Sequence, residues 1–307
     1  MRPNHLAALV VLSIIWGSAF MLVKVGLEEI DPLTLVAGRL VFGCLTLTAI
    51  LLITGRRLPL TRQAWLVFIA LGLGNNVWPF ILLTWGQDRI DSSLAAILTS
   101  SMTLSTAILA HFWINERLTP GQSLGIIVGF VGVFVLIGPD LGDITGSNAV
   151  GELSILLGVL GYSFGTVVAR RYLQETDGVA AAVGQTFVAS IIMVPLALAI
   201  DQPFDLDLPA KHAAAWLTLG IVASGLAYIL YFWLVRNVTA TQASIVGYLI
   251  PITAVILGAL VLDERLGMNS FVGMALIITG VWIVNGGWRS LTNRRRETPT
   301  PMLGRVE

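Results

Sequence analysis

Residues 113–138 read WINERLTPGQSLGIIVGFVGVFVLIG, and residues 261–286 read VLDERLGMNSFVGMALIITGVWIVNG. The two segments align without a gap at an offset of 148, which pairs Glu116-Arg117-Leu118 with Glu264-Arg265-Leu266 and places three glycines opposite three others. Apolar segments match by chance at Leu, Ile and Val, but a matched Glu-Arg-Leu and matched glycines are much harder to obtain that way. We therefore infer an internal duplication.

The duplication extends outward from this segment. The offset of 148 also pairs Trp85 with Trp233. Nearer the N-terminus the offset falls to about 146, which pairs Arg39 with Gln185. Each copy therefore covers most of one half of the chain.

The composition is that of a membrane protein. Of the 307 residues, 56% are hydrophobic and 12% are charged, the mean hydropathy is +0.84 and the formal net charge is zero. Soluble proteins carry about 25% charged residues, so the composition argues against a soluble enzyme. The basic residues form no stripe for phosphates, so no nucleic-acid partner is expected. The single cysteine, Cys44, excludes an intrachain disulfide.

A helix needs about 20 apolar residues to cross the hydrocarbon core of a membrane. The sequence predicts an all-α integral membrane protein with ten such helices, over roughly residues 6–25, 34–54, 64–84, 93–113, 121–138, 152–170, 179–200, 213–234, 242–262 and 268–288. The expected domains are a five-helix repeat over 6–138, a second over 152–288, and a disordered cytoplasmic tail over 289–307.

The distribution of positive charge predicts the orientation, because short loops rich in Lys and Arg mark the cytoplasmic side. With the N-terminus inside, only Lys24, Arg89, Lys211 and Arg265 fall in outer segments. Both termini are therefore expected in the cytoplasm. Each repeat has an odd number of spans, so the second copy is expected upside down. Inverted repeats are a recurring design of secondary transporters, because a site between them opens to each side in turn.

The motifs resemble those of the drug/metabolite transporter superfamily, specifically its EamA-type branch. In chain order they are Trp16-Gly17-Ser18, Arg39, Glu116-Arg117-Leu118, the stretch Ala227 to Trp233, Leu249-Ile250-Pro251 and Glu264-Arg265-Leu266. Their order and spacing over residues 6–288, more than any one motif, carry the resemblance. Thr103 stands where the family usually has proline in the fourth span, so the first half is expected to lack the kink that Pro251 predicts in the ninth.

The resemblance implies ten helices, a place in the inner membrane of a prokaryote, and export or exchange of small organic metabolites, such as amino acids or drug-like compounds. A channel or scaffold without alternating access is an alternative. A membrane-embedded enzyme is a weaker one, because the sequence has no metal constellation, phosphate loop or paired intramembrane carboxylates. We expect no cofactor and no metal. The expected partners are a small-molecule substrate and membrane lipid, and a homodimer remains open.

Polar and aromatic residues inside the predicted spans are the candidates for substrate binding: Trp16, Ser18, Asn75, Asn76, Trp78, Tyr162, Gln185, Tyr228, Tyr231 and Tyr248. An unsatisfied amide is expensive in hydrocarbon, so the two adjacent asparagines either bond between helices or line a cavity. Trp and Tyr near span ends often form an interfacial belt. Trp16, Tyr162 and Tyr228 lie deeper, which favours a lining role.

Arg39 is the one charge predicted within a span, where a central arginine costs about 2.5–3.5 kcal/mol on translocon scales. One interpretation is a snorkelling or structural arginine, paired with a carboxylate such as Glu28 or Asp31. The other is a gate or a contact for a substrate anion. No Asp or Glu is predicted at mid-span, which disfavours proton coupling through a buried carboxylate.

Several motifs predict structural roles. Glu116 and Glu264 each precede a helix, where an acid favours the helix dipole. The run Thr119-Pro120-Gly121-Gln122 predicts a capping box. Gly125, Gly129 and Gly132 share one helical face and predict close packing against another helix.

Overall fold

The protein is described by a computed structural model that covers residues 3–138, 145–173, 176–203, 207–238, 242 and 245–286. The predicted tail over 289–307 lies outside these residues. The first half contains α1 (Pro3–Gly26), α2 (Pro32–Ile53), α3 (Arg62–Leu71), η1 (Gly72–Val77), α4 (Trp78–Gln87), α5 (Ser92–Thr99), α6 (Met102–Trp113) and α7 (Pro120–Ile137). The second half contains α8 (Ser147–Tyr172), α9 (Gly178–Ile200), α10 (Ala210–Thr218), η3 (Leu219–Leu226), α11 (Ala227–Asn237), α13 (Ile245–Val261) and α14 (Met268–Val284).

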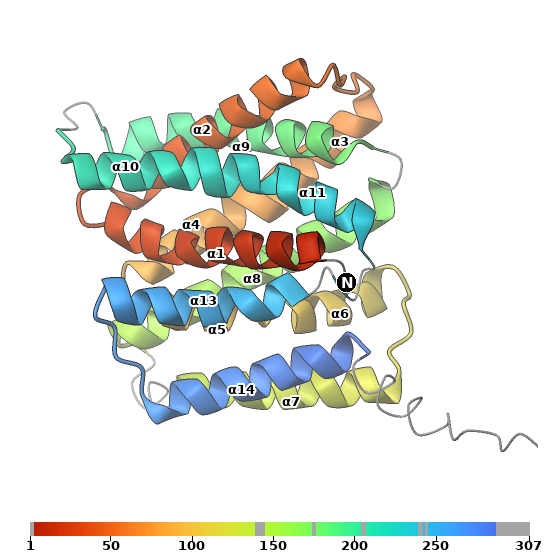
Figure 1. The fold of residues 1–307 in the computed structure, drawn as a ribbon, viewed down its shortest axis with the longest axis vertical. Helices are drawn as coiled ribbons and strands as arrows, with labels where there is room; N and C mark the ends of the chain where they lie inside the picture. The colour runs from red at the N-terminus through yellow and green to blue at the C-terminus, as the bar shows by residue number, and fades with distance from the viewer. Residues whose placement is uncertain are drawn as a thin grey trace, which may run out of the picture.

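The described part is all-helical, and its helices lie side by side in a layered bundle (Figure 1). Eight helices or continuous helical runs are long and apolar enough to cross a membrane, and α13 and α14 are shorter apolar helices. Where the sequence predicts ten spans, eight helical runs in the described part of the chain have the length and composition of a span, and α13 and α14 are shorter than the other eight. The protein is a multi-pass integral membrane protein.

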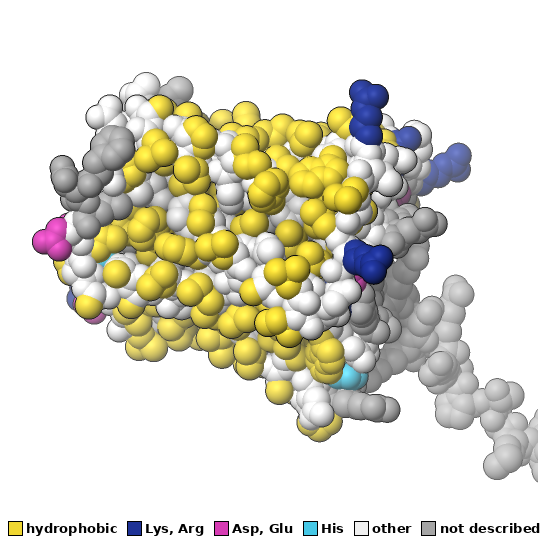
Figure 2. Space-filling view, turned by 90° about the horizontal axis from the view of Figure 1, so that it is seen from above, with side chains coloured by type: hydrophobic (Ala, Val, Ile, Leu, Met, Phe, Trp, Pro, Cys, Tyr) yellow, Lys and Arg dark blue, Asp and Glu magenta, His cyan; other side chains and the backbone are white. Residues whose placement is uncertain are grey.

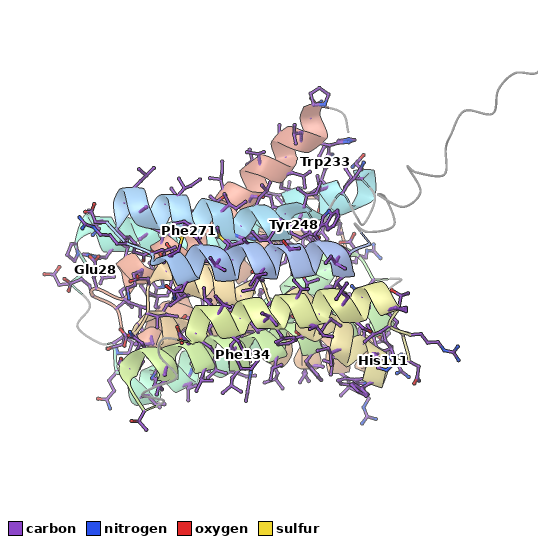
Figure 3. All side chains as sticks on the ribbon, turned by 90° about the horizontal axis from the view of Figure 1, so that it is seen from below. Glu28, His111, Phe134, Trp233, Tyr248 and Phe271 are labelled. Carbon is purple, nitrogen blue, oxygen red and sulfur yellow. The ribbon has the colours of Figure 1, made fainter. Side chains whose placement is uncertain are left out.

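The surface supports this assignment. Hydrophobic side chains cover the middle of the bundle, and charged side chains gather towards its two ends (Figure 2). Figure 3 labels Glu28 at one end and His111 at the other, with Phe134 and Phe271 between them. We call these the Glu28 end and the His111 end. The two phenylalanines are 62% and 46% exposed, as expected for side chains that face lipid.

A π-helical segment interrupts the third span at η1 and the eighth at η3. The offset of 148 carries one onto the other, so the duplication is visible in backbone geometry as well as in sequence. A π-helical turn is rare and often lies at a functional site. Here η1 packs against α9 of the other repeat, and η3 packs against α2.

The predicted glycine stripe of α7 is confirmed. A Cβ atom on Gly125 would lie 2.7 Å from the carbonyl oxygen of Gly280 in α14, and one on Gly132 would lie 2.8 Å from that of Gly273. Gly129 packs equally closely, against Leu104 of α6. The absence of side chains at these positions lets the backbones of α7 and α14 touch.

The capping box at the start of α7 is also confirmed, with Thr119 and Gln122 bonding to each other's backbone. The fourth span was predicted to lack a proline kink. Its helix is interrupted between α5 and α6, where the Ser100 and Ser101 hydroxyls each donate to the carbonyl three residues back, at 2.6 Å. Serine side chains that bond back in this way often bend helices.

Candidate functional site

Two aromatic pairs lie well inside the spans, and the internal repeat relates them. The ring centroids of Trp16 (α1) and Tyr228 (α11) are 6.3 Å apart with planes at 73°. Those of Tyr162 (α8) and Phe80 (α4) are 6.4 Å apart with planes at 72°. The offsets of 146 and 148 carry Trp16 onto Tyr162 and Phe80 onto Tyr228. Each edge-to-face pair, a preferred aromatic geometry, joins one repeat to the other.

Arg39 of α2 lies beside these pairs. Its Nε donates to the Ser224 hydroxyl of η3 at 2.8 Å, and its Cζ lies 4.0 Å from the centroid of the Phe80 ring. Within the described residues Arg39 has no ion pair with a carboxylate. Glu28, one of its predicted partners, bonds instead to Lys211 and His212 at 2.9 Å each. The positive charge is held by a hydroxyl and an aromatic face.

Gln185, the residue that the repeat matches to Arg39, forms a hydrogen-bonded amide pair. Asn75 of η1 donates from Nδ2 to Oε1 of Gln185 in α9 at 3.3 Å. Asn76 is 1% exposed, and its Nδ2 has no partner among the described residues.

We call the residues that make these contacts the central cluster: Trp16, Arg39, Asn75, Phe80, Tyr162, Gln185, Ser224 and Tyr228. Both repeats contribute, and Arg39 is its only charged member. The repeat matches that arginine to neutral Gln185, so the cluster carries a single positive charge, contributed by one repeat.

The remaining predicted residues lie around the cluster or away from it. Tyr231 packs on Trp16, with ring centroids 5.5 Å apart. The Ser18 hydroxyl donates to the Ile15 carbonyl in its own helix. Trp78 is 53% exposed and donates to the Leu157 carbonyl, and Tyr248 bonds to Val281 and Asn285 beside α14. These last three are not brought together with Arg39.

A cavity of about 620 Å³ opens at the His111 end. It is lined by Ile114, Asn115, Glu116, Arg170 and Arg171, and an ion pair of 3.5 Å joins Arg170 to Glu116. Both side chains of this pair are about half exposed.

The Glu28 end is held together by contacts between spans. Glu264, which follows α13, accepts hydrogen bonds from the backbone N–H groups of Ser92 and Ser93 at 2.7 and 3.0 Å and from the Ser93 hydroxyl. Lys24 at the end of α1 donates to the carbonyls of Gln87 and Ile90 at 2.7 and 2.9 Å. Burial and the nearby Glu264 raise the pKa of Asp91. The prediction for Glu264 was therefore wrong about its helix, because it caps α5 of the other repeat.

Sequence reasoning missed Phe80, Ser224 and Lys24. The repeat could have identified the first two, because Phe80 is the residue matched to Tyr228 and Ser224 is the residue matched to Asn76. No Asp or Glu was predicted at mid-span, and Glu152 lies in the second turn of α8, where it is 2% exposed.

Comparison with known proteins identifies relatives over almost the whole chain. The EamA-like transporter family matches residues 5–138 and 149–286. An uncharacterized transporter of Bacillus subtilis, YoaV, is 23% identical over 88% of this chain and 93% of its own. An uncharacterized inner membrane transporter of Escherichia coli, YedA, is 27% identical over 91% and 90%.

Two further comparisons extend this result. A probable terminal-alkyne amino-acid exporter of Streptantibioticus cattleyicolor is 26% identical over 96% of both chains. A protein of known crystal structure superposes with a TM-score of 0.68 at 18% identity, over 97% of this chain and all of its own. That structural likeness shows a shared fold.

Proposed function

This chain belongs to the EamA-like transporter family, and from that premise we propose that it is a secondary transporter of small organic solutes that works by alternating access. The observation that carries the proposal is the central cluster, in which contacts such as Arg39 to Ser224 cross between repeats. A carrier of this kind needs its binding groups at the seam between two units, because their relative movement then exposes those groups to one side at a time.

We propose that ten helices span the membrane as two inverted repeats. α13 and α14 have 17 residues each, which is the lower end of the spanning range of about 17–25. The repeat carries the contact of Gly125 with Gly280 onto that of Gly273 with Gly132, while α7 and α14 run in opposite directions (Figure 1). Such a relation is expected for an axis in the membrane plane.

We propose that the His111 end faces the cytoplasm, in the inner membrane of a bacterial cell. The described loops and helix ends there carry Arg56, Arg57, Arg62, Arg117, Arg170 and Arg171. Positive charge in short loops favours the cytoplasmic side. The start of α1 and the end of α14 lie at this same end (Figure 1), which supports cytoplasmic termini. The inner-membrane location is that of the relative YedA.

The substrate that fits best is an organic acid or zwitterion with an apolar or aromatic body. Arg39 supplies the only charge of the central cluster, so an anionic group on the solute would be its counterion. The edge-to-face pairs offer aromatic surfaces for the rest of the molecule. The relative described as an amino-acid exporter has a name consistent with this class. We propose no enzymatic activity, in keeping with the transporter names of the relatives.

The proposal is tested in two steps. Metabolites released by cells that overproduce the protein are compared with those released by cells that lack it, and the compound that differs is then loaded into reconstituted vesicles. Saturable flux with counterflow supports a carrier. Flux that rises linearly with concentration and shows no counterflow would favour the alternative, a channel, and no flux of any differentially released compound would reject both.

A further inference from the structure

At the two ends of the bundle, residues that the repeat relates to one another make different contacts. The offset of 148 carries Ile114, Asn115 and Glu116 onto Leu262, Asp263 and Glu264, and the offset of 146 carries Lys24 and Val25 onto Arg170 and Arg171. All five lining residues of the His111-end cavity therefore have counterparts at the Glu28 end. There, the counterparts of Glu116 and Arg170 are the residues that tie α5 and α4 in place.

The local backbone is the same at both ends. Asn115 and Asp263 both have positive φ, at 56° and 54°. The N–H of Glu116 donates to the Ala110 carbonyl at 3.3 Å, and the N–H of Glu264 donates to the repeat-related Gly258 carbonyl at 3.1 Å. The two glutamates thus leave their helices in the same way, and what differs is their partner.

The partners of the two glutamates differ between the two ends. The Glu264 carboxylate accepts hydrogen bonds from two backbone N–H groups and a hydroxyl at the start of α5. Hydrogen bonds to a charged group are strong, and the N-terminus of a helix favours an anion. Lys24 satisfies carbonyls at the end of α4 and just beyond it. Glu116 instead pairs with Arg170 at the edge of a cavity, with both side chains about half exposed.

We propose that Glu264 with Lys24, and Glu116 with Arg170, are two alternative gates that close opposite ends of the transporter. In the conformation described, Glu264 and Lys24 hold the Glu28 end shut while the His111 end is open. In the opposite conformation Glu264 releases α5, and Glu116 makes the equivalent contact at the start of the ninth span, which the repeat relates to the start of α5. This assignment rests on the proposed function, because it describes how access alternates.

The test measures distances at both ends in the full-length protein, reconstituted in lipid nanodiscs in a Cys44→Ser background. Spin labels are placed at Arg89 and Arg265 for the Glu28 end and at Asn237 and Arg117 for the His111 end, two pairs that the repeat relates. We expect Glu264→Gln to lengthen the first distance and to shorten the second. Because hydrogen bonds to a charged group are strong, the ratio of the two conformations should change about tenfold or more.

Matched variants separate gating from stability. Adding Glu116→Gln to Glu264→Gln should return the distances towards the wild-type values, since both gates are then weakened. Glu28→Gln, which removes a carboxylate bonded to α10 at the same end, should leave both distances unchanged. If Glu264→Gln does not fold, Lys24→Met carries the same expectation.

Opposed movement at the two ends is the decisive result. A longer Arg89–Arg265 distance with no shortening between Asn237 and Arg117, or no change at either end, would overturn the gate assignment. No transported solute is needed for these measurements. Failure of the gates with saturable flux in vesicles would leave the proposed function standing, and opposed movement without flux would reject the proposed function alone.

Discussion

The guanidinium carbon of Arg39 lies 4.0 Å from the centroid of the Phe80 ring, so a cation–π contact joins α2 to α4 inside the bundle. A desolvated contact of this kind is worth about 2 kcal/mol, and the Ser224 hydroxyl adds a hydrogen bond to Nε. The two contacts offset much of the cost of an arginine in a span without a carboxylate. Under the proposed function, the anionic group of the solute would be the counterion of this arginine.

Replacing that charge should impair transport without preventing insertion. We expect Arg39→Gln, which takes the residue found at the repeat-related position, to raise the KM for an anionic or zwitterionic solute by about tenfold or more, the loss of one charge-assisted contact. Counterflow in vesicles measures the effect. Arg89→Gln is the matched control, because Arg89 stacks 3.5 Å over Trp85 at the Glu28 end, away from the central cluster. Unchanged kinetics in Arg39→Gln would remove Arg39 from the binding site.

The contact between α7 and α14 should be intolerant of even a methyl group. A Cβ on Gly280 would lie 2.5 Å from the Gly125 carbonyl oxygen and from the Gly129 nitrogen. These are backbone atoms, which cannot move without shifting the helix. We expect Gly280→Ala to destabilise the protein by about 1–3 kcal/mol, seen as a lower melting temperature in detergent. Gly247→Ala, where no atom lies within 4 Å, serves as the control. Equal melting temperatures for the two variants would contradict the close packing.

The orientation predicts which end an impermeant reagent reaches. In a Cys44→Ser background, we expect Glu29→Cys at the Glu28 end to be labelled by a maleimide added to the periplasmic side of intact cells. Gln63→Cys at the His111 end should be labelled only after the membrane is permeabilised. Both positions are exposed, so access depends on sidedness and not on burial. The reverse labelling pattern would show that the bundle lies the other way up.

The sequence was sufficient for the family, the membrane location and the repeat, because these depend on composition and on spacing that a single chain displays. The sequence predicted a lining role for Trp16, Tyr162 and Tyr228, and the structure places each of them against an aromatic ring of the other repeat. It did not predict that Arg39 rests on Phe80, since a phenylalanine in a span carries no polar signal. Nor did it predict that Glu264 caps α5, because that pairing depends on how two distant helix ends pack.

The N-cap of α9 should make stability depend on pH. Asp177 accepts hydrogen bonds from the N–H groups of Val179 and Ala180 and forms an ion pair of 2.9 Å with Arg56. Burial alone would raise the pKa of Asp177, but the hydrogen bonds from Arg56 and the backbone outweigh it, and the pKa lies below its ordinary value. A depressed pKa means that the folded state favours the carboxylate, so this stabilisation is present above the unfolded pKa of about 3.9.

We therefore expect Asp177→Asn, which keeps an acceptor for the cap but loses the charge, to melt at a lower temperature than the wild type above about pH 5. The difference should shrink as the pH falls below about 4, because protonation then removes the same charge from the wild type. Melting temperatures in detergent between about pH 3 and pH 7 measure this convergence. Asp88→Asn, at an exposed position at the other end of the bundle, is the control. A difference that stays constant over the whole range would mean that the shape of the aspartate at this cap, and not its charge, stabilises α9.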